Sequence, residues 1–455
     1  MILSSFLIYL VYTTFNLSNL KLINRLFIII MSFTLILILS SYNILFIDNI
    51  SLYNDWFKLT SLNIPVLYLI IIFIIILFIY NTSSIKYNIQ SSYLILLILA
   101  NIIGILLLPM SNDLISFYIV LELQSYSLYL LTGLHNKSYN SIRASLLYFI
   151  IGGIASVLIL LSIFYIYNIT GTTNLSIINI YNNYNNNDIN LYSNILLIGL
   201  LFKMGMAPLH NWSISVYNYS PTYITAYISI IAKLSIVSFI FINNWLFNKE
   251  ILIIFFYLSL FIAAYKPLYQ INIKIILAYS GILNFSYILL TIVTYDISYY
   301  LYLIQYTLTH VLLFIIILLI SEYNSKPYNK WSPIVFIHQL IIPNKILVLS
   351  FILCLFSLIG IPPLPGFYAK FYVIVSLIND NYILESITIV IFSVIATYYY
   401  AYIIKILIKN YNNYNNSYIN LNPFISYIVS ILTILILSFY SYLPMLSEGL
   451  LTILL

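Results

Sequence analysis

The chain repeats one short pattern, Gly-x-x-Pro-Leu, first as Gly205-Met206-Ala207-Pro208-Leu209 and, 155 residues later, as Gly360-Ile361-Pro362-Pro363-Leu364. Each copy lies inside a long apolar stretch with a lysine close by. Proline breaks a helix because it lacks a backbone N–H and its ring clashes with the preceding turn. Broken apolar helices at matching positions are typical of transporters, in which the breaks lie near the middle of the membrane. We therefore expect Gly205, Pro208, Gly360, Pro362 and Pro363 to interrupt two membrane helices.

The composition places the chain in a membrane. Of its 455 residues 63% are hydrophobic and 6% are charged, and the mean hydropathy is +1.04. Soluble domains carry about 25% charged residues. No basic cluster resembles a nucleic-acid site, so we attribute the net charge of +6 to membrane topology. The single cysteine, Cys354, excludes an intrachain disulfide and an iron–sulfur cluster held by cysteines.

Apolar stretches of about 20 residues can cross a bilayer as helices, which satisfy their own backbone hydrogen bonds. The sequence contains fourteen such stretches, so we predict an all-α polytopic membrane protein with about fourteen transmembrane helices. The predicted spans are 2–19, 25–47, 62–80, 92–110, 114–134, 144–167, 194–217, 222–243, 251–266, 274–295, 299–321, 345–378, 386–408 and 423–446.

The offset of 155 residues also relates whole spans. It carries the middle of the fourth span onto the ninth, and the middle of the sixth onto the eleventh. Spans 4–8 and 9–13 are therefore two five-helix repeats, and because five is odd, the second must cross the membrane in the opposite direction to the first. We divide the chain into an N-terminal three-helix segment (1–91), a first repeat (92–246), a second repeat (247–409), and a C-terminal loop and helix (410–455).

Charges outside the spans predict the sidedness, because basic residues collect on the inner face of membrane proteins. One set of loops and helix ends holds twelve basic residues and only Glu322 as an acid; the opposite set holds nine acids and two basic residues. The first set is Lys21, Arg25, Lys86, Lys137, Arg143, Lys266, Lys274, Lys326, Lys330, Lys345, Lys405 and Lys409, and the second is Asp48, Asp55, Asp113, Asp188, Glu250, Asp296, Asp380, Glu385 and Glu448 with Lys58 and Lys249. We expect both termini on the acidic, outer face.

Four charges lie inside predicted spans: Glu122, Lys203, Lys233 and Lys370. A charge at the bilayer centre is costly and usually marks an ion path, although a long side chain can also reach water from a helix end. We expect Glu122 and Lys203 to pair, because a buried Glu and Lys at variable separation form a proton switch. Lys233 follows on the next span, within reach for proton transfer from Lys203. None of these charges recurs after 155 residues, so the two repeats cannot do identical chemistry.

Polar stripes and two histidines extend this candidate path. Glu122 shares a helix face with Tyr118, Ser125, Tyr126 and Tyr129, and the second repeat carries the stripes Ser280, Asn284, Tyr287 and Tyr302, Tyr306, His310. His310 and His210 are candidate relays, because imidazole titrates near neutrality; the alternative for both is core packing. No two histidines are spaced to hold a haem or a copper ion. Gly152 and Gly153 lie in an apolar helix, where we expect them to permit close helix packing.

The segments around two buried lysines resemble a known family. They read Phe202-Lys203-Met204-Gly205-Met206-Ala207-Pro208-Leu209-His210-Asn211-Trp212 and Gly360-Ile361-Pro362-Pro363-Leu364-Pro365-Gly366-Phe367-Tyr368-Ala369-Lys370. With charges in spans 5, 7, 8 and 12 of fourteen, the chain is similar to the antiporter-like subunits of respiratory complex I. Lys370 favours the members with lysine rather than glutamate in the twelfth span, and 455 residues are too few for the longest member, which carries a long lateral helix. Phe314 departs from the larger members, which often carry lysine there.

The resemblance implies a proton-translocating membrane-arm subunit of an NADH:ubiquinone oxidoreductase in the mitochondrial inner membrane. Glu122, Lys203, Lys233 and Lys370 would transfer protons, with His310 and His210 as relays. The chain would hold no cofactor and no metal, because NADH, FMN, the iron–sulfur clusters and ubiquinone would bind to other subunits. Its partners would be the other membrane-arm subunits, including neighbouring antiporter-like subunits, and membrane lipid.

The residues by themselves leave two other classes open. A free-standing cation/proton antiporter would show the same inverted repeat and the same lysines, and its transport would depend on sodium. A structural membrane subunit that conducts nothing would leave proton transport intact when Lys203 and Lys233 are neutralised.

Overall fold

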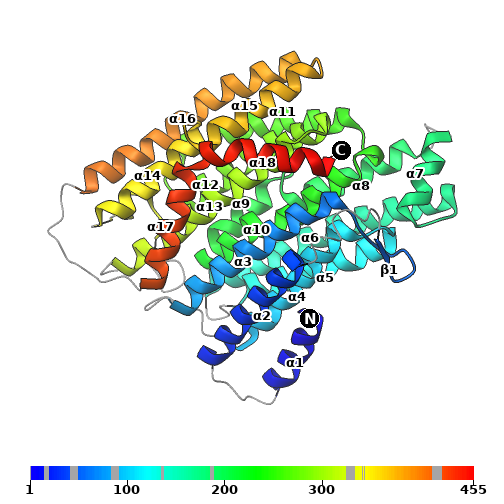
Figure 1. Cartoon of the computed structure of the whole chain (residues 1–455), viewed down its shortest axis with the longest axis horizontal. Coiled ribbons are helices and arrows are strands. Elements are labelled where there is room, and N and C mark those ends of the chain that lie inside the picture. Colours follow the sequence, from blue (N-terminus) through cyan, green and yellow to red (C-terminus); the bar gives the residue numbers. More distant parts are fainter. Residues whose placement is uncertain are drawn as a thin grey trace. The chain divides into compact units, whose positions relative to one another are not determined.

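The computed structural model describes residues 2–14, 20–40, 50–83, 92–134, 138–184, 189–323, 334–340, 342, 344–411 and 423–454, and these form a helical protein (Figure 1). The helices are α1 (Ile2–Thr14), α2 (Leu20–Ser40), α3 (Ile64–Ser83), α4 (Ser92–Leu107), α5 (Leu114–Thr132), α6 (Tyr139–Thr170), α7 (Leu175–Tyr184), α8 (Asn190–Met204), α9 (Asn211–Tyr219), α10 (Thr222–Ile242), α11 (Lys249–Tyr265), α12 (Ile273–Thr294), α13 (Ser298–Tyr323), α14 (Lys345–Ile359), α15 (Pro365–Asn379), α16 (Ile383–Tyr411), α17 (Pro423–Leu437) and α18 (Phe439–Leu454). One antiparallel hairpin joins β1 (Ile50–Leu52) to β2 (Phe57–Leu59).

The chain forms two compact units. The first comprises residues 1–75, 90–219 and 231–254, and the second comprises 76–89, 220–230 and 255–455. In the first unit α5 packs along α4 and α6, and α6 also packs against α8 and α9. In the second unit α13 packs against α14, α15 and α17. The helices α3 and α10 each contribute residues to both units.

Nine helices of the described residues are long and apolar enough to cross a membrane, or ten spans if the bent pair α17 and α18 counts as one. Four further apolar helices are shorter: Ile2–Thr13, Arg25–Leu37, Asn190–Met204 and Lys345–Ile359. Each of the fourteen segments predicted from the sequence contains at least one helix. The number that crosses the membrane stays a prediction, because length and composition do not decide it for the short helices.

Both predicted helix breaks are confirmed. α8 ends at Met204 and α9 begins at Asn211, while α14 ends at Ile359 and α15 begins at Pro365. A glycine follows each first half with a positive φ, +70° at Gly205 and +95° at Gly360, where an L-residue would be strained. The Ala207–Pro208 and Pro362–Pro363 peptide bonds are cis. One of the two predicted breaks lies in each compact unit.

Three features were not predicted from the sequence: the hairpin, α7, and a bend of 74° between α17 and α18, where the sequence predicted one continuous span (423–446). The bend is visible at the red end of the chain in Figure 1. It lies at Ser438, whose hydroxyl donates to the carbonyl of Ile434 at 2.6 Å, a local bond of the kind that bends helices. The two helices together are apolar enough for one span, so mean hydropathy gives no sign of the bend.

Burial separates interior helices from peripheral ones. The apolar windows of α10, α12 and α13 are 100%, 94% and 89% buried, whereas those of α6 and α16 are 39% and 33% buried. The last two expose apolar side chains that a membrane or a partner subunit would cover. Two of the candidate site residues lie on these interior helices, Lys233 on α10 and His310 on α13.

Candidate functional site

Glu122 and Lys203 form the ion pair expected from the sequence. Glu122 lies in the middle of α5, Lys203 lies in the last turn of α8, and Lys203 Nζ is 2.7 Å from Glu122 Oε1. Their side chains are 13% and 7% exposed, respectively. Ser125, one turn further along α5, donates from its hydroxyl to Glu122 Oε2 at 3.2 Å. The ion pair between Glu122 and Lys203 is therefore largely buried.

The break after α8 explains why Lys203 is held at that position. A helix carboxyl end carries partial negative charge, which stabilises a nearby cation. Gly205 ends the helix with its N–H donating to Phe202 O, and the indole Nε1 of Trp212 on α9 donates to the same carbonyl at 3.1 Å. A Cβ on Gly205 would come within 2.7 Å of Ser213, so the two half-helices approach too closely for a larger residue.

His210 lies in this break, as predicted. It is 2% exposed, and its Nδ1 is 3.2 Å from the carbonyl of Pro208.

Lys233 belongs to the same unit as the ion pair and is 4% exposed, in the interior helix α10. Its ammonium lies 5.5 Å from the centre of the Tyr217 ring, which attracts a cation through its quadrupole. The preceding residue, Ala232, accepts a hydrogen bond of 2.7 Å from Gln124 Nε2 on α5. Gln124 is two residues after Glu122, so one side chain fixes the helix of the acid against the helix of this lysine.

Lys370 lies beside the second break, in α15. Its ammonium donates to the carbonyls of Leu358 and Ile359, at 3.0 and 2.9 Å, and lies 5.8 Å from the centre of the Tyr287 ring. These carbonyls belong to the last turn of α14, where a helix leaves its C=O groups without intrahelical partners. In the second unit the half-buried Lys370 is thus held by backbone carbonyls, whereas Lys203 is held by a carboxylate.

The two polar stripes of the second repeat meet. Tyr302 on α13 donates to Asn284 Oδ1 on α12 at 2.8 Å, and Asn284 in turn donates to Ser280 O. Tyr306 donates to the carbonyl of Ser229 at 3.2 Å, and its ring centre lies 4.3 Å from that of His310, which is 1% exposed. Ser229 precedes Lys233 by one turn of α10.

Lys274 corrects one assignment made from the sequence. We placed it among the basic surface charges, but it is 5% exposed and donates from Nζ to the carbonyl of Ser220 at 2.7 Å. It lies in the first turn of α12, at the edge of the predicted span, where the sequence does not distinguish a lysine that reaches water from a buried one. Gln124 was missed for another reason: an uncharged amide does not stand out in an apolar helix.

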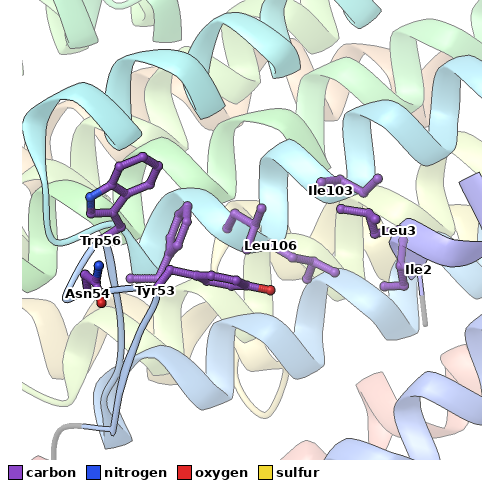
Figure 2. A pocket seen from close by; sticks show the side chains of 9 residues that line it. Ile2, Leu3, Tyr53, Asn54, Trp56, Ile103 and Leu106 are labelled. Atoms are coloured by element: carbon purple, nitrogen blue, oxygen red, sulfur yellow. The ribbon is translucent and has the colours of Figure 1, made fainter. Parts of the chain in front are cut away.

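Other features lie apart from these charges. A cavity of about 740 Å³ is bounded by Ile2 and Leu3 of α1, the hairpin residues Tyr53, Asn54 and Trp56, and α4 (Figure 2). Its walls are apolar, and no buried charge lines it.

Among the described residues, no three His, Cys, Asp or Glu side chains gather into a metal-binding group. His338 is described and exposed, whereas His135 lies outside the described residues.

The chain is similar to a known family and to named relatives over most of its length. A family model described as "NADH:quinone oxidoreductase/Mrp antiporter, TM" matches residues 111–397. The NADH-ubiquinone oxidoreductase chain 2 of Debaryomyces hansenii is 51% identical over 451 residues, which cover 99% of both chains. The protein of the same name from Candida albicans is 54% identical over 454 residues, covering 99% of this chain and 95% of the relative.

A chain of the respiratory complex I of Thermus thermophilus, solved with bound aureothin, matches the fold with a TM-score of 0.81 at 20% identity. The match covers 99% of both chains, so the architecture extends from one end of the sequence to the other.

Proposed function

Because the chain belongs to the NADH:quinone oxidoreductase/Mrp antiporter family, we propose that it translocates protons through its buried Glu122, Lys203, Lys233 and Lys370. It is a membrane-arm subunit of an NADH:ubiquinone oxidoreductase and a multi-pass protein of the mitochondrial inner membrane. The other membrane-arm subunits, including neighbouring antiporter-like subunits, are its partners.

One observation carries the mechanism: the buried contact between Glu122 and Lys203 at 2.7 Å. A buried ion pair is stable only while its members remain together, since separating them leaves two charges without compensation. A change that draws Glu122 away from Lys203 therefore favours release of the proton of Lys203. The break after Lys203 gives the chain a point at which such a change can be absorbed without unwinding a continuous helix.

From Lys203 the proton passes to Lys233, and from there along the polar stripes of α12 and α13 to Lys370. Ser229 lies one turn before Lys233 and accepts from Tyr306, the ring neighbour of His310. His210 and His310 act as relays beside this route. Quinone reduction in other subunits drives the change at Glu122. Electrons pass through NADH, FMN, iron–sulfur clusters and ubiquinone bound by those subunits, and this chain holds no redox centre and no metal.

The test is the number of protons moved per NADH oxidised. In reconstituted complex, a Lys203→Ala variant should oxidise NADH more slowly and move fewer protons per NADH than the unsubstituted enzyme. Lys249→Ala, which removes an exposed lysine of the same chain, should change neither quantity. A Lys203→Ala complex that moved the full number of protons would refute the proposed route.

Two alternatives are not favoured by the relatives, and two measurements together separate the three functions. Mitochondrial membranes are solubilised gently and run on a native gel that is stained for NADH oxidation, and mass spectrometry locates the chain. A membrane-arm subunit is found in the large NADH-oxidising band, and a free-standing cation/proton antiporter runs alone. A non-conducting structural subunit also runs in the large band, but keeps full proton transport in the Lys203→Ala variant.

We propose the organisation inferred from the sequence: an N-terminal three-helix segment (1–91), repeats at 92–246 and 247–409, and a C-terminal loop and helix (410–455). Both termini face the intermembrane space. The support is the segregation of basic and acidic residues to opposite sets of loops.

A further inference from the structure

The first unit contains a second polar feature that the proposed proton route does not use. It is a pocket of about 280 Å³ at the amino end of α5 and the carboxyl end of α10. Its lining includes Lys58, Thr60, Asn63, Asn112, Asn179 and Asn243, which come from the hairpin, from α7 and from the ends of neighbouring helices. We call it the polar pocket.

The lining of the polar pocket is suited to binding water. Asn63 is 1% exposed, and neither its Oδ1 nor the buried Oγ1 of Thr60 has a hydrogen-bond partner among the described residues. Buried polar atoms in native proteins nearly always have a partner, which is often an ordered water. The lining presents an acceptor at Asn63, a hydroxyl at Thr60 and an ammonium at Lys58. Water can donate to the first group and accept from the other two, whereas an anion only accepts and would leave the Asn63 oxygen without a donor. At about 30 Å³ per molecule, the volume suits several waters.

A polar layer lies further along the same two helices, α5 and α10, with one further member on α4. Gln124 on α5 donates to Ala232 O, and Ser235 on α10 donates to Gln124 Oε1 at 3.2 Å. Asn101 on α4 donates to the backbone carbonyl of Gln124 and to Ser127 Oγ, both at 2.8 Å. We define this layer as Asn101, Gln124, Ser127 and Ser235; Ser235 follows Lys233 by two residues on α10.

Two stacked aromatic rings lie between the polar layer and the polar pocket in the order of residues along both helices. Phe117 on α5 and Phe239 on α10 stack with their ring centres 4.2 Å apart and their planes inclined by 22°, and both are fully buried. Along α10 the order is Ser235, Phe239 and Asn243, one turn apart on a single face. Asn243 lines the polar pocket, and its amide donates back to the carbonyl of Phe239 at 3.1 Å.

The order along α5 agrees. Asn112 in the polar pocket comes first, Phe117 follows, and Gln124 stands two turns further on. From Ser235 to Asn243 the distance along the helix axis is about 12 Å, which a short file of waters would bridge if the rings were absent. Apolar constrictions of this kind stop conduction because water does not occupy them.

We propose that the stacked rings of Phe117 and Phe239 form a seal against proton leak, closing the polar layer off from a water-filled polar pocket. This goes beyond the proposed function, since the seal acts on the resting protein and needs no turnover. A membrane enzyme with polar groups from its centre to its surface would otherwise let protons flow back down the gradient that it builds.

The test measures passive proton conductance without NADH. The whole complex is reconstituted into vesicles, a potassium diffusion potential drives protons, and an internal pH dye reports their entry. Phe239→Ala and Phe117→Ala should each raise the conductance several-fold. Phe239→Leu should keep the seal, because its side chain remains large and apolar. Phe241→Ala is the matched control: Phe241 is fully buried on α10 but lies on another face, so its removal should not raise the conductance.

Alanine variants that assemble and hold the gradient as the unsubstituted complex does would overturn the proposal, and so would an equal leak in Phe241→Ala. If the alanine variants do not assemble, Phe239→Asn tests the same point, since its polar side chain should admit water and raise the conductance. The leak test uses no NADH, so its outcome does not depend on whether Lys203→Ala changes proton pumping.

A labelling experiment tests the two compartments directly. A membrane-impermeant thiol reagent is added from the hairpin face to complexes carrying Asn243→Cys or Ser235→Cys. Asn243→Cys should react, whereas Ser235→Cys should react only when Phe239→Ala is also present. An unreactive Asn243→Cys would show that the polar pocket is dry, and a Ser235→Cys that reacts beside intact rings would show that the stack does not seal. Either result overturns the proposal.

Discussion

At the scale of single residues, the Glu122–Lys203 pair determines what the first unit can do. Both side chains are largely buried, and Ser125 adds a hydrogen bond to the carboxylate. Desolvation opposes burying either charge singly, so neither is stable there without its partner. The pair is therefore a poor source of stability and a good switch, because a small displacement changes the energy of both ions.

This predicts a non-additive double mutant. Glu122→Gln should destabilise the subunit by about 3–5 kcal/mol, because it leaves the Lys203 ammonium buried without its carboxylate. The double variant Glu122→Gln/Lys203→Met should recover much of that loss, since no charge remains. The readout is the amount and the thermal unfolding midpoint of assembled complex. Equal losses in the single and the double variant would show that the pair is not coupled.

Four of the candidate charges are conspicuous in the sequence, for a physical reason. A charge inside an apolar run is conspicuous, so Glu122, Lys203, Lys233 and Lys370 could be selected without a structure. Lys274 could not, because a lysine at the edge of a span is buried or exposed according to neighbours distant in sequence. Gln124 shows the same limit, since its importance lies in its bonds to α10.

At the scale of elements, proline and glycine made the broken helices predictable, because their backbone restrictions act locally. The bend at Ser438 was not predictable, since no proline or glycine stands there and the run stays apolar. α7 was missed because its Asn-rich end resembles a loop, and the hairpin because its strands have only three residues each. An element can be predicted from the local sequence when a single residue imposes its backbone conformation. It cannot be predicted in this way when tertiary packing determines the conformation.

Two neighbouring glycines of α6, Gly152 and Gly153, differ in whether tertiary packing requires a glycine. A Cβ on Gly152 would overlap the ring of Tyr129 on α5, whereas a Cβ on Gly153 would meet nothing within 4 Å. The Tyr129 ring also packs edge-on against Tyr148, with ring centres 4.7 Å apart. Of the two glycines that we expected to permit close packing, Gly152 has this role and Gly153 does not.

We predict opposite effects for the two alanine substitutions. Gly152→Ala should destabilise the complex by about 1–3 kcal/mol, as overpacking does, because the Tyr129 ring must move. Gly153→Ala should be neutral or should stabilise by about 0.5–1 kcal/mol, since it removes backbone freedom from a helix interior. Thermal unfolding of purified complex measures both, and a Gly153→Ala loss as large as that of Gly152→Ala would contradict the packing argument.

At the scale of the whole molecule, the two units use different chemistry on related frameworks. Each contains a broken helix with a lysine beside the break, but a carboxylate holds Lys203 and backbone carbonyls hold Lys370. This agrees with the sequence, in which the charges do not recur at the repeat offset. The repeated feature is the helix break, which provides adaptable backbone, whereas the charged side chains differ between the halves.

The last prediction concerns the orientation of the molecule in the membrane. Twelve basic residues and one acid occupy one set of loops and helix ends, and nine acids and two basic residues occupy the other. One correction applies: Lys274 is buried, and without it the first set still holds eleven basic residues. The positive-inside rule is a bias over many loops, so one misassigned lysine does not reverse it.

Epitope tags fused before Met1 and after Leu455 should therefore be cleaved by protease in mitoplasts, whose outer membrane has been removed. They should be protected in inverted inner-membrane vesicles. A tag inserted at 326–330, between the predicted eleventh and twelfth spans, is the internal control and should show the opposite pattern, because it lies with Lys326 and Lys330 in the basic set. Termini on opposite faces would mean an odd number of crossings and would exclude fourteen. Both termini protected in mitoplasts would keep an even count but invert the sidedness, so the polar pocket would face the matrix.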